Sequence, residues 1–212
     1  MSRLQTEFHD GHFQAILENQ LFVGPAVSAT KLDQLTKANI RFIINVTAEH
    51  PCYHPTEITY LHRKIIDDSN TEMLEIWDDS CVFIDTAIAK GAAVLVHCSA
   101  GISRSVSVVL AYLIKNRRMP LKSALHLVRS SRPIASPNIG FMRQLCDWEQ
   151  QHLGCSSMNL IDCVVDYTSQ TFLELSEDQL RKIAVQCHGD MSQTVDRCVQ
   201  VMIDSKRWKS ST

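Results

Sequence analysis

The chain has 212 residues, of which 45% are hydrophobic and 21% charged, with a formal net charge of −2 and a pI near 6.5. This suits one globular domain with a small appendage, and the weak charge gives no reason to expect nucleic acid or a membrane as partner. The eight cysteines have irregular spacings without a Cys-x-x-Cys pair, and the N-terminal stretch lacks the apolar core of a signal peptide. We therefore expect reduced thiols, no metal or cofactor, and a cytoplasmic or nuclear location.

The first half of the chain predicts short strands that alternate with helices. Residues 14–25 are expected to form two strands around a turn at 18–20, because glycine and proline stop the apolar run. Apolar residues at helical spacing predict a helix over 28–40 with Ser28 as its N-cap. Further apolar runs predict strands at 40–47, 57–66 and 92–97, with a long amphipathic helix at 71–91.

Three helices are expected after the last of these strands. The first covers 105–116, the second begins at Pro120, and the third has Ser136 as N-cap with Pro137 in its first turn. Strands that alternate with helices describe an α/β domain, which we assign to residues 12–154. We expect a central, mostly parallel sheet flanked by helices.

A tight loop joins the strand at 92–97 to the following helix, within the stretch VHCSAGISRS at residues 96–105. Small side chains and a glycine let this loop fold back with its N–H groups pointing inward. Inward amides and a helix N-terminus form an anion cradle of phosphate size, and an arginine adds a bidentate grip. The residues expected to bind the phosphate are Ser99, Ala100, Gly101, Ile102, Ser103 and Arg104.

Cys98 lies at the base of this predicted cradle. Amides, a helix N-terminus and Arg104 stabilise a thiolate, so we expect Cys98 to be ionised at neutral pH and to attack phosphorus. Ser105 can donate a hydrogen bond to the sulfur when it leaves in the second step, or can serve as the helix N-cap. His97 adjoins the nucleophile in the chain and is not placed to act as its base. We expect it to be buried and to orient the loop.

A phosphate monoester also needs an acid that protonates the departing oxygen. The segment IIDDSNTEM, residues 65–73, supplies Asp67 and Asp68 on a loop between a predicted strand and a predicted helix. Either carboxyl group suits this role on chemistry alone.

Taken together, three motifs closely resemble the dual-specificity branch of the cysteine-dependent protein tyrosine phosphatases. They are VHCSAGISRS, the following AYLI, and RPxxxPNxGFMRQL at 132–145, and the resemblance covers about residues 12–153. It implies the cysteine phosphatase fold, with Cys98 as nucleophile and Arg104 as phosphate ligand. It also implies that Asn138 braces the phosphate loop.

The resemblance selects between the two aspartates. Members of this family have a tyrosine before the acid and an aromatic residue after it, and Tyr60, Asp67 and Trp77 fit that spacing without a gap. The acid loop is most similar to that of the Slingshot type. We see no docking domain of the kind found in kinase-directed members, so the chain is expected to resemble the small atypical members. The family's shallow pocket implies phosphotyrosine, phosphoserine and phosphothreonine in proteins as substrates, hydrolysed through a cysteinyl-phosphate.

Residues 155–212 differ in character from the domain before them. They predict three short helices, with Ser176 and Gln179 forming a capping box and a break at Gly189 and Asp190. The segment resembles ubiquitin-binding modules of the UBA or CUE kind, which implies ubiquitin or another protein as partner. The alternative is a helical extension that packs on the catalytic domain, because apolar stripes at helical spacing are common in cores.

Two other classes of function share parts of this pattern. A sulfurtransferase or an arsenate reductase also uses a thiol on such a loop, but neither needs a mobile acid at Asp67. A phosphoprotein-binding module with weak turnover is the remaining alternative, although inactive relatives usually lose the cysteine that is present here as Cys98.

Overall fold

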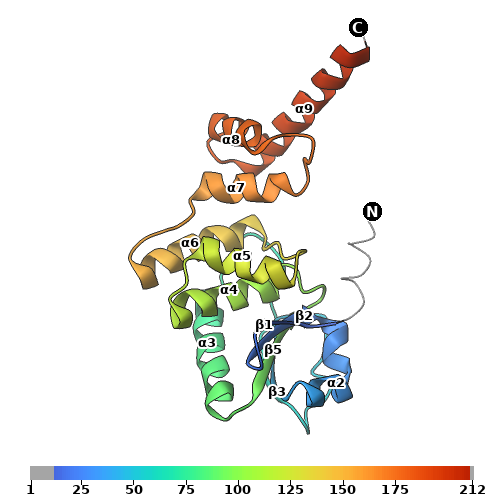
Figure 1. Ribbon diagram of the computed structural model, residues 1–212, viewed down its shortest axis with the longest axis vertical. Coiled ribbons are helices and arrows are strands. Elements are labelled where there is room, and N and C mark those ends of the chain that lie inside the picture. Colours follow the sequence, from blue (N-terminus) through green and yellow to red (C-terminus); the bar gives the residue numbers. More distant parts are fainter. Residues whose placement is uncertain (1–11, 211–212) are drawn as a thin grey trace. The chain divides into compact units, whose positions relative to one another are not determined.

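A computed structural model describes the backbone of residues 12–210 and the side chains of residues 12–205. The chain divides into two compact units, with the boundary between Ser157 and Met158. The first unit contains a sheet with helices around it, and the second contains three helices (Figure 1).

The sheet of the first unit has the order β1-β2-β5-β3-β4. Only the edge pair β1–β2 is antiparallel, and the other three pairs are parallel. The strands are β1 (Gln14–Leu17), β2 (Leu21–Pro25), β3 (Ile40–Asn45), β4 (Thr59–His62) and β5 (Ala93–Cys98). Every residue of β5 is buried, as expected for the central strand of a parallel sheet that is covered on both faces.

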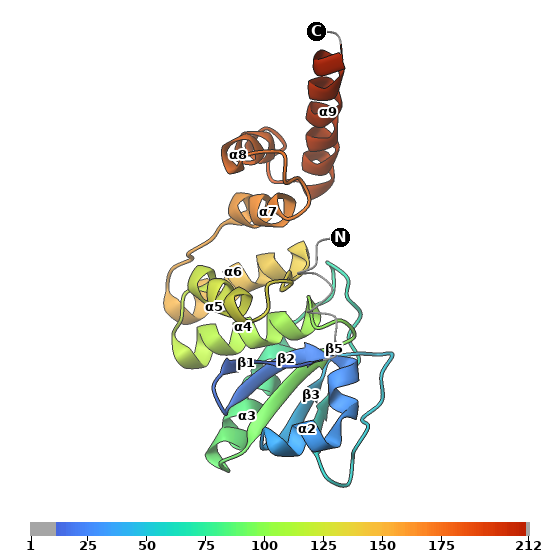
Figure 2. The same ribbon diagram turned by 45° about the vertical axis from the view of Figure 1, so that its right-hand side comes forward.

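Helices cover both faces of this sheet (Figure 2). One face packs against the 3-10 helix η1 (Ala26–Thr30) and α2 (Leu32–Lys37), where Leu35 lies in one cluster with Ile43 and Leu95. The other face packs against the remaining helices, and Phe42 of β3 contacts Phe83 edge-on, with 5.4 Å between ring centroids. Of these helices, α3 (Leu74–Ala89) and α4 (Arg104–Arg117) lie on the sheet, α5 (Leu121–Ser131) contacts the edge strand β1, and α6 (Ile139–Leu153) packs on α4. The predicted α/β class with a mostly parallel sheet is confirmed.

The structure corrects two predicted helix starts. Ser28 is not an N-cap, because it lies within η1 and donates its hydroxyl hydrogen to the Pro25 carbonyl at 2.5 Å. Ser136 does not cap α6 either, since that cap is Asn138, whose side-chain oxygen accepts the Phe141 N–H at 2.9 Å. Both regions offer more than one serine or asparagine, and tertiary contacts decide which of them caps the helix.

The second unit consists of α7 (Leu160–Ser169), α8 (Glu177–Gln186) and α9 (Met191–Ser210). The predicted capping box of Ser176 and Gln179 starts α8, and a second box starts α7. The expectation of three short helices is wrong for α9, which has 20 residues. Among the described residues, no helix has the length and hydrophobicity needed to cross a membrane.

Candidate active site

The fold brings Cys98 and Arg104 to the carboxyl edge of the sheet. Cys98 is the last residue of β5, and Arg104 is the first residue of α4. The Cys98 side chain is buried, and its Sγ accepts two hydrogen bonds, from the Gly101 N–H at 3.2 Å and from the Ser105 hydroxyl at 3.3 Å. Ser105 is the second residue of α4 and therefore not its N-cap. Two polar donors thus surround the sulfur and stabilise its anion.

In the loop 99–103 the main-chain carbonyl groups point outward, away from the N–H groups. Its outward carbonyl groups are satisfied by donors beyond the loop, and those of Ser99 and Ile102 accept the N–H groups of Ala26 and Ser136. By contrast, its N–H groups other than that of Gly101 have no acceptor within residues 12–210. The turn requires φ +68° at Gly101, a left-handed conformation that favours glycine. The loop can therefore donate several amides to one oxyanion.

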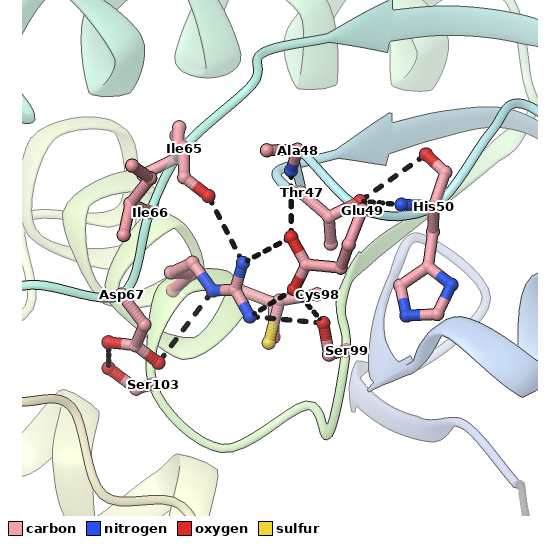
Figure 3. A network of polar contacts seen from close by, with 12 residues as sticks. Thr47, Ala48, Glu49, His50, Ile65, Ile66, Asp67, Cys98, Ser99 and Ser103 are labelled. Atoms are coloured by element: carbon pink, nitrogen blue, oxygen red, sulfur yellow. Dashed lines mark hydrogen bonds and ion pairs between the residues drawn. The ribbon is translucent and has the colours of Figure 1, made fainter.

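The Arg104 guanidinium is buried and held from several sides. Nη1 donates to the Ile65 carbonyl at 3.1 Å, and Nη2 donates to Ser99 Oγ at 3.0 Å. Glu49 pairs with both terminal nitrogens, at 2.9 and 3.2 Å. Nε alone has no hydrogen-bond acceptor in the described part of the chain, and Asp67 Oδ2 lies 3.7 Å from it. Figure 3 shows Glu49, Asp67 and Cys98 around this group.

Glu49 is fixed by more than the arginine. It accepts the Ala48 N–H at 2.9 Å and the hydroxyl of Ser99. The Arg104 hydrogen bond, opposed by partial desolvation, lowers the pKa of Glu49 to about 2. Burial acts to lower the pKa of Arg104, but Glu49 and the neighbouring anions outweigh it, so the net shift is upward. The pair is therefore ionised at neutral pH.

The two candidate acids have different surroundings. Asp67 Oδ1 accepts the Ser103 hydroxyl at 2.7 Å and the Asn138 amide at 2.8 Å, beside Arg104. Asp68 instead accepts the N–H of Asn70 at 2.8 Å, a contact within its own exposed turn. Asn138 also donates its main-chain N–H to Ser103 Oγ at 3.0 Å. Asn138 therefore links the acid loop to the phosphate loop.

His97 lies beneath the loop with no solvent exposure. Its Nδ1 lies 3.4 Å from the Cys98 carbonyl oxygen, and its Nε2 has no partner within residues 12–210. Burial lowers the pKa of His97 to about 4, so the ring is neutral at physiological pH. A neutral, buried ring agrees with a role in orienting the loop.

Two charged residues at this site, Glu49 and Arg132, were not among those predicted from the sequence. The parallel pairing of β3 with β5 places Asn45 beside His97. The segment after β3 must therefore lie near the phosphate loop, and an acidic residue four positions beyond that strand was a usable signal. Arg132 is the first residue of the motif at 132–145, but nothing in that motif indicates that its side chain reaches the phosphate loop from the end of α5.

Comparisons with known proteins agree with this geometry. The family model "Dual specificity phosphatase, catalytic domain" matches residues 21–151. Dual specificity protein phosphatase 1 of Arabidopsis thaliana is 40% identical over 144 residues, which are 68% of this chain and 72% of that protein. The Slingshot homolog of Xenopus laevis is 40% identical over 125 residues, which are 59% of this chain and 18% of that protein.

Solved structures give the same result. Human DUSP28 has a TM-score of 0.63 at 32% identity, covering 66% of this chain and 93% of that one. A mouse putative dual specificity phosphatase complexed with zinc tungstate has a TM-score of 0.63 at 33% identity, with 66% and 87% covered. The chain belongs to the dual specificity phosphatase family. Its activity is accordingly that of a protein phosphatase, and its substrates are phosphorylated proteins.

Proposed function

We propose that Cys98, Arg104 and Asp67 hydrolyse phosphate esters of tyrosine, serine and threonine in proteins. The Cys98 thiolate attacks phosphorus, and an S–P bond forms as the bond between phosphorus and the side-chain oxygen breaks. The loop amides and Arg104 hold the phosphoryl oxygens, whose charge they stabilise in the transition state. Asp67 gives its proton to the departing oxygen.

The second step releases the enzyme. Water attacks the cysteinyl-phosphate, the Asp67 carboxylate takes a proton from that water, and the P–S bond breaks to leave inorganic phosphate and the thiolate. Ser105 donates its hydroxyl hydrogen to the sulfur as negative charge returns there. The 3.3 Å contact between Ser105 Oγ and Cys98 Sγ supports this role.

One observation carries the proposal. A sulfur that accepts the Gly101 N–H lies below further loop amides without acceptors in the described chain, next to an arginine whose Nε also has no hydrogen-bond acceptor there. The test is hydrolysis of p-nitrophenyl phosphate with a chelator present. Wild type is expected to turn over and Cys98→Ser to be inactive. Equal activity of the two would exclude Cys98 as nucleophile.

The same experiment separates this proposal from a module that only binds phosphoproteins. One solved relative carries the name human tyrosine phosphatase-like serine/threonine/tyrosine-interacting protein, and its chain is 34% identical to this one. A binding module would retain affinity for a phosphopeptide and release no phosphate from it. The presence of Cys98 with two hydrogen-bond donors favours turnover.

For the second unit we propose a protein partner, with ubiquitin as the candidate suggested by the resemblance to UBA and CUE modules. Exposed apolar side chains support this, among them Leu173, which is 83% exposed, and Val185 and Val199. The full chain is titrated with ubiquitin by NMR, and Leu173→Asp is expected to weaken binding. If the chemical-shift changes do not saturate at millimolar ubiquitin, ubiquitin is excluded as the partner.

A further inference from the structure

Arg132 is a buried cation outside the residues given a role above. It follows α5, and its side chain is among the largest fully buried ones, with 1% of the residue exposed. Nε donates to the Gly101 carbonyl at 2.5 Å, and Nη2 donates to the Ala100 carbonyl at 2.8 Å. Nη1 donates to the side-chain oxygen of Gln14. Two of its three acceptors are therefore carbonyls of the phosphate loop.

The partners of Arg132 are all neutral. Within residues 12–210, no carboxylate forms an ion pair with its guanidinium. A buried charge without an opposite charge costs several kcal/mol, in contrast to Arg104, which Glu49 neutralises. Burial lowers the pKa of Arg132, and the charge of Cys98 acts in the opposite direction. Among the groups around the guanidinium, Cys98 is thus the one whose negative charge would offset this buried cation.

The loop also packs tightly on the guanidinium. A Cβ atom added at Gly101 would lie 2.8 Å from Arg132 Nη2 and 2.6 Å from the Gly24 carbonyl carbon. The loop therefore fits between β2 and the arginine with no free space at this point. Its carbonyls turn toward Arg132, and a peptide unit that turns its carbonyl one way turns its N–H the other way.

We propose that Arg132 is the second cation of the phosphate site, acting as a positioning residue from the carbonyl side of the loop. It holds the Ala100 and Gly101 carbonyls away from the phosphate, so that the amides face it. Its positive charge also stabilises the Cys98 thiolate. This role rests on the proposed function of Cys98, and it is tested by chemistry that needs no turnover.

The test follows the pH dependence of alkylation by iodoacetamide, a neutral reagent, with the Cys98 peptide quantified by mass spectrometry. In Arg132→Met the pH midpoint is expected to rise by about one unit, which slows alkylation below the midpoint about tenfold. Arg132→Lys retains the charge and is expected to retain most of the wild-type midpoint. The exposed Cys155 provides a reference in the same sample, and its profile should stay unchanged.

Gln14→Glu provides a second variant that does not remove the arginine. The new carboxylate would pair with Arg132 through the existing contact to residue 14 and neutralise its field. Thermal stability should stay the same or rise, while the Cys98 midpoint rises and kcat falls. A purely structural brace would be strengthened by this change, with no shift of the midpoint.

The outcomes separate the two claims. Unchanged Cys98 midpoints in both Arg132→Met and Gln14→Glu would overturn the role of Arg132, whatever the activity. If Arg132→Met does not fold, Gln14→Glu decides alone. If the Cys98 midpoint shifts in these variants but the wild-type protein does not hydrolyse phosphoesters, the role of Arg132 is supported and the proposed function is rejected.

Discussion

Glu49 holds both terminal nitrogens of Arg104 and leaves the Nε without a hydrogen-bond acceptor in the described chain. The carboxylate therefore fixes the plane of the guanidinium before a substrate binds. A bidentate pair of this kind adds orientation as well as energy. An arginine that is already oriented loses less side-chain entropy when it grips a phosphate.

Replacing this carboxylate should impair catalysis more than folding. We expect Glu49→Gln to lower kcat/KM about tenfold, because the amide replaces one of the two acceptor oxygens by a donor and removes the negative charge that faces the guanidinium. Glu57→Gln is the matched control, since Glu57 is exposed and, among the side chains of residues 12–205, accepts only from Thr56. Steady-state kinetics on p-nitrophenyl phosphate measure both variants. If kcat/KM is unchanged in Glu49→Gln, Ile65 and Ser99 suffice to orient Arg104.

The identity of the acid is tested by the pair Asp67 and Asp68. We expect Asp67→Ala to lower kcat by roughly 10²–10⁴, the usual contribution of a general acid. Asp68→Ala should change kcat little, because its carboxylate only caps a turn. With a substrate whose leaving group needs no proton, the loss in Asp67→Ala should shrink. If Asp68→Ala lowered kcat more than Asp67→Ala, Asp68 would be the general acid instead.

The first turn of α6 supports the acid loop through Gly140. A Cβ atom at this position would lie 1.8 Å from the Ser69 carbonyl oxygen, two residues after Asp67. Gly140→Ala should therefore displace the acid loop and lower kcat at least tenfold, since a shift of about 1 Å at a catalytic group is costly. Alkylation of Cys98 should change much less than kcat, because the added Cβ meets Ser69 of the acid loop and not the phosphate loop itself.

Gly91 provides a contrasting control for that experiment. It has φ +67°, and an added Cβ atom would meet nothing within 4 Å. Gly91→Ala should cost about 1 kcal/mol of stability through backbone strain and leave kcat unchanged. If Gly140→Ala behaved like Gly91→Ala, contact with the acid loop would not matter for catalysis.

The sequence predicted the parts of the site that are contiguous in the chain. A strand, a tight loop and a helix place Cys98 and Arg104 with little help from the rest of the fold. Glu49 and Arg132 were missed because they reach this loop from 55 and 31 residues away in sequence, respectively. Such contacts depend on strand order and on the position of α5, and neither can be read from local periodicity.

The buried ring of His97 predicts a pH dependence of stability. Its pKa of about 4 lies below the ordinary value of 6.5, so the unfolded chain binds the proton more readily. Its contribution is complete above about pH 6.5 and is lost as the pH falls through 4, at up to about 1.4 kcal/mol per pH unit. Urea unfolding at pH 7.5, 5.5 and 4.5 should therefore show a smaller difference between wild type and His97→Gln at lower pH. His152→Gln is the comparison: burial also lowers the pKa of His152, but its ring is only partly buried, so the difference from wild type should change less with pH.

Ser105 separates the two chemical steps. Its hydroxyl contacts the Cys98 sulfur, which must accept negative charge only when the cysteinyl-phosphate is hydrolysed. We expect Ser105→Ala to slow the steady state about tenfold or more and to leave the first turnover nearly unchanged, so that a burst of p-nitrophenol appears in rapid-mixing experiments. Ser107→Ala is the matched control, because this buried hydroxyl donates to the Arg104 carbonyl and not to the sulfur. Equal slowing of burst and steady state in Ser105→Ala would place the hydroxyl in the first step instead.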